Sequence, residues 1–171
     1  NLKDYHQLYS WSISNSKGFW ESFWKFSNII SSETYTQICN DISKMPGAKW
    51  FLGAKLNFAE NLLRYRGDSI AIKFYGEDHV HRELTYAQLY IEVEKFTAAL
   101  RSMGLQKGDR VVGFIPNLPE AIIAMLATSS IGAIWSSSSP DFGIKGVLDR
   151  FSQIEPKVVV AADGYYFKGK L

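Results

Sequence analysis

The chain has 171 residues, of which 46% are hydrophobic and 15% aromatic, enough to bury one core or a core with a small appendage. This composition excludes disorder for most of the chain. The formal charge is +2 and the basic residues are scattered, which argues against nucleic acid or an anionic membrane as a partner. Cys39 is the only cysteine, so an internal disulfide is excluded; we expect a small apolar residue on a helix, in a reducing compartment.

Neither a signal peptide nor a membrane-spanning segment is predicted. The start, NLKDYHQLYSW, lacks the basic end and apolar run of a signal peptide. The longest apolar window, residues 121–135, contains a threonine and two serines and is shorter than the ~20 residues that a bilayer requires. We therefore expect a soluble, cytoplasmic protein. Asn1 is not a methionine and the final GKL completes no element, so we expect a chain cut from a longer one.

Residues 1–66 are rich in aromatic side chains and show little strand alternation. The segment from Ser16 through GFWESFWKFSNII predicts a helix capped by Ser16. Its aromatic face is typical of a packing surface rather than a ligand cage; it comprises Phe19, Phe23, Phe26 and Ile30, widened by Trp20 and Trp24. MPGAKWFLGAKL predicts an irregular segment, and NFAENLLRY a short helix with a capping box of Asn57 and Glu60. We expect residues 1–66 to form a mainly helical layer.

From Ser69 onward the periodicity changes. SIAIKFY and HVHREL alternate with period two around GED, which predicts a β-hairpin. His79 and His81 would share one strand face, but because no third ligand follows at a suitable spacing, we favour a solvated face over a metal site. Thr85 and Gln88 predict a capping box for a helix that ends at Gly104.

Strands and helices then alternate. The predicted elements are a strand at VVGFI, a helix at AIIAMLATSSI capped by Asn117 and Glu120, a strand from Ala133, a helix at GIKGVLDRFSQI and a strand at KVVVAAD. The second helix would place Val147, Leu148, Phe151 and Ile154 on one side. Apolar strands separated by helices predict a parallel sheet covered on both faces, which is an α/β fold of the doubly wound type.

Ligands bind such sheets beyond the carboxyl ends of the strands, which here precede residues 116–120, 136–143 and 163–170. The second loop, SSSSPDFG, could be a linker, a nucleophile site or the rim of a pocket. A strand before it and a helix after it argue against a linker, and the missing G-x-S-x-G elbow argues against a serine nucleophile. Phe142 and Val147 match a hydrophobic staple in either case. Neither a G-x-G-x-x-G nor a phosphate-loop motif is present, so no catalytic group is visible.

Three stretches of the sequence resemble the N-terminal part of acyl-CoA synthetases of the adenylate-forming superfamily. They are WFLGAKLNFAENLL, the segment from LTYAQLY to SSSSPDFG, and LDRFSQIEPKVVVAAD. Residues 1–66 resemble the N-terminal region of acetyl-CoA synthetase relatives, and residues 67–171 resemble the first part of a truncated AMP-binding domain. Acetate-activating members usually carry a Gly-Gly-Phe-Ser-type loop, whereas the loop at residues 136–143 is similar to that of acetoacetate-activating members.

The resemblance implies a reaction in which a carboxylate, ATP and Mg²⁺ form an acyl-adenylate and pyrophosphate, after which CoA displaces AMP. It also implies that the phosphate loop, the adenine-binding segment, the Mg²⁺-binding glutamate and the catalytic lysine lie beyond residue 171. We therefore expect no catalytic or metal-binding residue in this chain, no tight binding of ATP, and no ATP–pyrophosphate exchange by these residues on their own.

The resemblance also implies a share of the CoA site. The matching positions are Pro140, Asp141 and Phe142, and residues 167–170. Relatives carry arginines near the latter, where this chain has Phe167 and Lys170; lysine meets a phosphate as a point charge without the bidentate fork. We hypothesise that Lys168 and Lys170 face the CoA phosphates; the alternative is that both are ordinary solvated lysines.

Three functions remain open at this point. The first is the N-terminal part of a ligase with acetoacetate, ATP and CoA as substrates. The second is a ligase for another short acid, such as acetate or propionate. The third is a non-catalytic module that binds a partner through its aromatic half.

Overall fold

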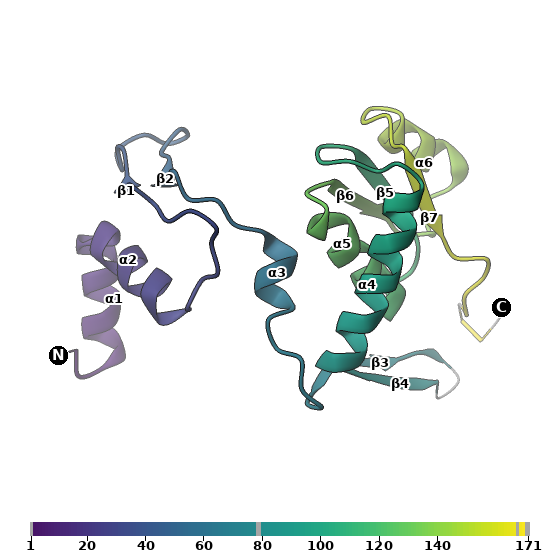
Figure 1. The fold of residues 1–171 in the computed structure, drawn as a ribbon, viewed down its shortest axis with the longest axis horizontal. Coiled ribbons are helices and arrows are strands. Elements are labelled where there is room, and N and C mark those ends of the chain that lie inside the picture. Colours follow the sequence, from purple (N-terminus) through teal and green to yellow (C-terminus); the bar gives the residue numbers. More distant parts are fainter. Residues whose placement is uncertain (1, 78–79, 167, 170–171) are drawn as a thin grey trace. The chain divides into compact units, whose positions relative to one another are not determined.

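The computed structural model describes residues 2–77, 80–166 and 168–169 and divides into two compact units, residues 1–57 and 58–171 (Figure 1). The first unit contains α1 (Tyr5–Ser14), α2 (Ser16–Phe26), β1 (Gln37–Cys39) and β2 (Trp50–Leu52). The second contains the hairpin and the parallel sheet. None of the helices in the described ranges is both long and apolar enough to cross a bilayer.

The helix pair α1 and α2 differs from the prediction in two ways. Helix α1 was not predicted; it begins after Asp4, whose carboxylate accepts a hydrogen bond from the backbone N–H of Gln7 at 2.8 Å. The cap of α2 is Asn15 rather than Ser16, because the Asn15 side chain accepts from the N–H of Gly18 at 3.1 Å. Helix α2 also ends at Phe26, so Ile30 lies outside it.

The aromatic packing of the first unit uses the part of the predicted face that contains Trp24. The Trp24 ring lies 4.7 Å from Phe51 and 5.4 Å from Tyr35, measured between centroids. Phe26 of the stripe is 82% exposed. The periodic pattern found the helix and included Trp24, where β2 meets it through Phe51, but it wrongly included Phe26 in the packed side.

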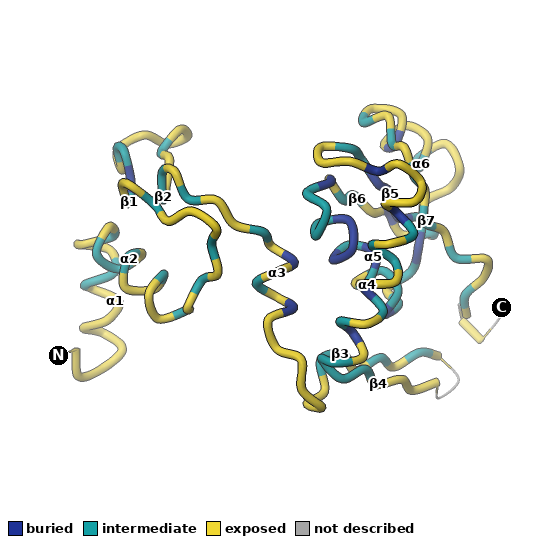
Figure 2. The backbone as a smooth tube through the Cα atoms, in the orientation of Figure 1, coloured by how far each residue is buried: buried dark blue, intermediate teal, exposed yellow. Residues whose placement is uncertain are grey.

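The short sheet of β1 and β2 corrects two further predictions. Gln37 pairs with Leu52 and Cys39 with Trp50, so β2 lies within MPGAKWFLGAKL, the segment predicted to be irregular. A ladder this short is below the length at which alternation becomes visible in a sequence. Cys39 is buried as expected, but it lies on a strand rather than a helix. Among the described residues of the first unit, Cys39 alone is buried. Figure 2 accordingly shows the first unit as mostly exposed or intermediate.

The predicted hairpin and the helix after it are confirmed. After α3 (Phe58–Leu62), β3 (Ile70–Tyr75) pairs antiparallel with β4 (His81–Thr85). Helix α4 (Tyr86–Ser102) begins with the predicted capping box: the Thr85 N–H donates to Gln88 Oε1 at 2.9 Å, and the Gln88 N–H donates to Thr85 Oγ1 at 3.1 Å. Gly104 follows the helix with a φ of +78°, which favours glycine.

The parallel sheet has the strand order β6-β5-β7, which confirms the α/β fold. It consists of β5 (Arg110–Phe114), β6 (Ile134–Ser138) and β7 (Val158–Ala161), connected by α5 (Pro119–Ser130) and α6 (Ile144–Phe151). The chain moves from β5 to β6 on one side and returns past β5 to β7 on the other. Since such crossovers are right-handed, α5 and α6 lie on opposite faces.

The core lies between α4, α5 and one face of the sheet. It includes Leu89, Leu100, Val111 and Leu126, all at most 5% exposed. Figure 2 shows buried backbone along β5 and α5. The opposite face, which carries α6, is less covered. Val159 of β7 and Leu148 of α6 are both exposed there. Leu148 was predicted to pack with Val147, Phe151 and Ile154, of which Phe151 is buried.

Two predicted boundaries around α5 and β6 are corrected. The residue before α5 is Leu118, with no side-chain cap hydrogen bond, so Asn117 does not cap this helix; Pro119 occupies its first turn instead. Strand β6 continues through Ser138, so three of the four serines belong to the strand. Serine forms a strand here because β5 supplies backbone pairing through Gly113–Ser137 and Phe114–Ser138.

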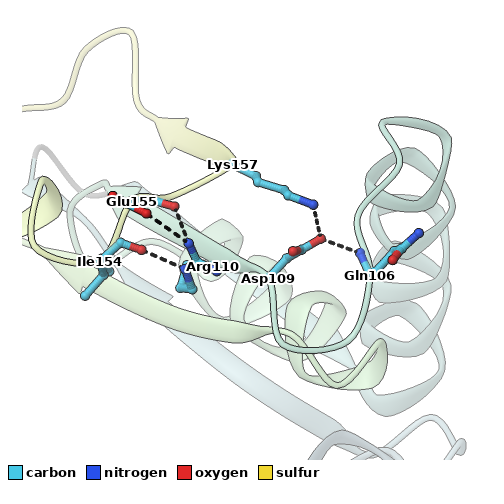
Figure 3. A network of polar contacts seen from close by, with 6 residues as sticks. All are labelled: Gln106, Asp109, Arg110, Ile154, Glu155 and Lys157. Carbon is cyan, nitrogen blue, oxygen red and sulfur yellow. Dashed lines mark hydrogen bonds and ion pairs between the residues drawn. The ribbon is translucent and has the colours of Figure 1, made fainter.

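Polar contacts join β5 to β7 at the amino ends of these strands (Figure 3). Asp109 Oδ2 accepts from Lys157 Nζ at 2.8 Å and from the backbone N–H of Gln106 at 2.8 Å. Arg110 Nε donates to the carbonyl of Ile154 at 2.7 Å, and its Nη2 donates to the carbonyl of Glu155 at 2.9 Å. The Lys157 hydrogen bond, with that of the Gln106 N–H, lowers the pKa of Asp109 below its ordinary value.

Candidate functional site

The carboxyl ends of the three parallel strands lie level with one another. Phe114 at the end of β5 pairs with Ser138 of β6 and with Ala161 of β7. The loops that follow the strands therefore start from one edge. Because the chain leaves β5 and β6 toward opposite faces, the ends of these two strands form a topological switch point, which is where open α/β sheets bind ligands. This edge is the candidate site.

The loop after β6 spans residues 139–143, shorter than the predicted 136–143, because the strand takes Ser136 to Ser138. Ser139 Oγ donates to Asp141 Oδ2 at 2.8 Å, and the Asp141 N–H donates back to Ser139 Oγ at 3.3 Å. These contacts shape the loop locally, and a regular strand and helix flank it. It is a strand-to-helix turn rather than a linker.

Ser138 is a buried polar group at the end of β6. It is 7% exposed, and its hydroxyl has no hydrogen-bond partner among the residues that the structure describes. A buried hydroxyl without a partner costs free energy relative to one in water. The sequence does not distinguish Ser138 from the other three serines, because its burial depends on the packing of the folded sheet.

Phe142 presents a ring at this edge that is 44% exposed. The Arg150 guanidinium carbon lies 4.1 Å from the ring centroid, and Arg150 Nη1 donates to the Gly146 carbonyl at 2.8 Å. Gly146 makes room for this arrangement, because a Cβ there would be 3.2 Å from Arg150 Nη1. The spacing of four between positions 142, 146 and 150 was visible in the sequence and could have identified Arg150. The staple between Phe142 and Val147 stays a prediction.

The loop after β7 contacts the loop after β6 through Tyr165. Its hydroxyl donates to Asp141 Oδ1 at 3.2 Å. Partial desolvation and the Asp141 carboxylate both raise the pKa of Tyr165 above its ordinary value, so this phenol remains protonated and able to donate near neutral pH. The sequence placed Tyr165 in the loop at residues 163–170 but gave no sign of its pairing with Asp141, because the contact joins positions 24 apart.

The same loop is anchored a second time, on the hairpin. The backbone N–H groups of Lys168 and Gly169 donate to the two carboxylate oxygens of Glu77 at 3.1 and 2.8 Å. Both residues have positive φ, +53° and +73°, so that successive N–H groups converge on one anion. Of the predicted CoA-site residues, Lys168 is described and exposed, whereas Phe167 and Lys170 lie outside the described residues.

A cavity of about 1070 Å³ lies beside this edge, between the hairpin, α4, α5 and the end of β7. Its walls include Phe96, Ile123 and Val160, with an ion pair of Arg82 and Glu120. Burial raises the pKa of the Glu120 carboxyl, but the hydrogen bonds from Arg82 and from its own backbone N–H more than offset this, and the pKa lies below its ordinary value. Sequence reasoning missed the cavity because distant elements form it.

Metal-binding side chains do not gather in the described part of the chain, where no group of three histidine, cysteine or carboxylate residues is placed to hold an ion. His81 is exposed, with its ring against Tyr75 at a centroid distance of 4.7 Å. His79, the other member of the pair considered from the sequence, lies outside the described residues.

Comparisons with known proteins identify the family. Residues 58–169 match the AMP-binding enzyme family, and residues 5–62 match the acetyl-coenzyme A synthetase N-terminus. The acetoacetyl-CoA synthetase of Macaca fascicularis is 47% identical over 175 residues, covering 99% of this chain and 26% of that protein. The enzyme of that name from Rhizobium meliloti (strain 1021) is 47% identical over 170 residues, with the same coverage.

A solved structure shows the same similarity in three dimensions. The acetoacetyl-CoA synthetase from Streptomyces lividans superimposes with a TM-score of 0.92 at 41% identity, over 99% of this chain and 26% of that one. The chain thus spans about a quarter of the length of these relatives. The resemblance to acyl-CoA synthetases drawn from the sequence is confirmed, and the chain belongs to the AMP-binding enzyme family.

Proposed function

We propose that this chain is part of an AMP-forming ligase that converts acetoacetate, ATP and CoA to acetoacetyl-CoA, AMP and pyrophosphate through an acyl-adenylate. The observation that carries the proposal is the similarity, at 45–47% identity over 99% of the chain, to proteins named acetoacetyl-CoA synthetase from several vertebrates and a bacterium. The proposal includes a division into residues 1–66, an acetyl-CoA-synthetase-like region, and residues 67–171, the first part of the adenylation domain.

The proposed role of the described edge is to hold CoA. Phe142 offers an exposed aromatic face on which a nucleotide base could stack, and Lys168 offers a point charge for a phosphate. Pro140 and Asp141 complete the loop that carries Phe142, and Lys170 lies two positions after Lys168. The adenylation step needs Mg²⁺ to offset phosphate charge, and the resemblance assigns its ligand to residues after 171.

The proposal further includes a cytosolic protein whose partners are small molecules, with no nucleic acid or membrane partner. A single cysteine and a formal charge of +2 support this part of the proposal.

Product analysis of the full-length protein tests the reaction class. We expect acetoacetate, ATP and CoA to yield the thioester with one equivalent each of AMP and pyrophosphate, detected by chromatography. Formation of ADP and phosphate instead, or ATP consumption without a thioester, would show a different class of reaction.

Replacement of the two lysines tests the CoA contacts. We expect the Lys168→Ala and Lys170→Ala double variant to raise the KM for CoA about tenfold, since each lysine contributes a charge-assisted contact. The matched control replaces Lys44 and Lys49, which are exposed lysines of the first unit, and leaves this KM unchanged. An unchanged KM in the Lys168 and Lys170 double variant would refute the contacts and favour solvated lysines.

A further inference from the structure

The Asp141 carboxylate lies between the loop after β6 and the loop after β7, and each of its oxygens accepts from a hydroxyl. Oδ2 accepts from Ser139 in its own loop at 2.8 Å, and Oδ1 accepts from Tyr165 in the other loop at 3.2 Å. The carboxylate therefore joins two loops that both border the proposed CoA site.

The charge of Asp141 makes it unsuited to touch the phosphates of CoA directly. A carboxylate repels an anionic ligand and, when ionised, has no proton to donate to a phosphate oxygen. Phe142, which directly follows Asp141, is exposed and is the residue of this loop proposed to stack on the base of CoA. The contribution of Asp141 is therefore geometric: it fixes the loop that presents its neighbours.

The loop after β7 has two anchors within its described part. The N–H groups of Lys168 and Gly169 are held by Glu77 of the hairpin, and Tyr165 reaches Asp141. The Tyr165 hydroxyl thus ties the loop that carries Lys168 to the loop that carries Phe142, the two residues proposed to meet the phosphate and the base of CoA.

We propose that Tyr165 is a positioning residue for the thioester-forming step: through Asp141 it holds the two loops at the separation that CoA requires. This inference rests on the proposed function. It assigns no chemical step to Tyr165, whose hydroxyl remains a hydrogen-bond donor throughout. The adenylation step, which precedes CoA binding, does not depend on the contact.

The Tyr165→Phe variant of the full-length protein tests this role, because it removes one hydroxyl and keeps the ring. We expect the KM for CoA to rise about fivefold, as for loss of one net hydrogen bond, while acetoacetate-dependent ATP–pyrophosphate exchange stays within about twofold of wild type. Tyr75→Phe is the matched control, an exposed tyrosine on β3 outside both loops, and should change neither quantity.

A double-mutant cycle separates positioning from general loss of structure. In an Asp141→Ala background, Tyr165→Phe should change the KM for CoA by less than about twofold, since the partner is already missing. The inference is overturned if the two effects multiply, if Tyr165→Phe leaves the KM for CoA unchanged, or if exchange falls in parallel with CoA affinity. Absence of acetoacetate-dependent exchange in the wild-type protein would instead remove the proposed function, and this inference with it.

Discussion

Gly113, in the middle of β5, shows how a single residue determines the packing of the sheet. A Cβ at this position would lie 2.6 Å from two carbon atoms of the Trp135 ring on β6, closer than real contacts allow. The indole therefore occupies the space that a side chain on β5 would need. Trp135 packs against the core from this position.

We predict that Gly113→Ala destabilises the protein by about 1–3 kcal/mol, the usual cost of forcing an added carbon into a packed core. The measurement is the free energy of unfolding from urea titration. Gly67→Ala is the matched control, because a Cβ there meets no atom within 4 Å. Equal stability of the Gly113 variant and wild type would contradict the packing described here.

Individual site residues could be predicted only where chain order placed them. Chain order placed the loop at residues 136–143 at the ligand-binding edge, and the resemblance to relatives then singled out Pro140, Asp141 and Phe142 within it, which stays a prediction. The pairing of Asp141 with Tyr165, and of Glu77 with Lys168 and Gly169, joins residues 24 and about 91 positions apart. Such contacts depend on the tertiary fold, and the sequence has no periodic signal for them.

At the scale of elements, the contact between β5 and β7 at Asp109 and Lys157 gives a pH dependence with a definite sign. The pKa of Asp109 is lowered in the folded protein, chiefly by the hydrogen bond from Lys157. Its stabilisation is therefore present above the ordinary aspartate value of about 4 and is lost as pH falls through the lower, folded value.

We predict that Asp109→Asn lowers the free energy of unfolding at pH 7, and that its difference from wild type shrinks progressively below about pH 4. Urea titrations at pH 7 and pH 3 measure this difference. Asp68→Asn serves as the control, since Asp68 is an exposed carboxylate in the segment before β3. A difference for Asp109→Asn that stays constant or grows on acidification would contradict the assigned role.

Helices and strands were predicted best where the local sequence carries a capping motif or a clear apolar period. Helix α4 combines a capping box with apolar residues at helical spacing, and the structure has both. Helix α5 has a strong apolar pattern but begins at Pro119 without a side-chain cap, so its predicted cap at Asn117 was wrong. Strands β1 and β2 were missed because three residues are too few to show alternation, and β6 was cut short because serine is a weak strand signal.

At the scale of the whole molecule, the chain supplies a scaffold and one edge of a site. The relatives that it matches are about four times as long, since the chain covers 26% of each. The described residues place two loops at one edge of the sheet, which we propose to hold CoA, whereas the resemblance assigns the phosphate loop and the catalytic lysine to later residues. Selectivity among carboxylic acids is therefore expected to be a property of the full-length protein.

Acetoacetate-dependent ATP–pyrophosphate exchange by the full-length protein, with acetate and propionate assayed in parallel, tests whether the enzyme activates acetoacetate. A site built to bind the keto oxygen of acetoacetate rejects acids that lack it, so we predict a kcat/KM for acetoacetate at least about tenfold above that for either acid. Exchange that is equal or faster with acetate or propionate, or absent with all three acids, would contradict the account.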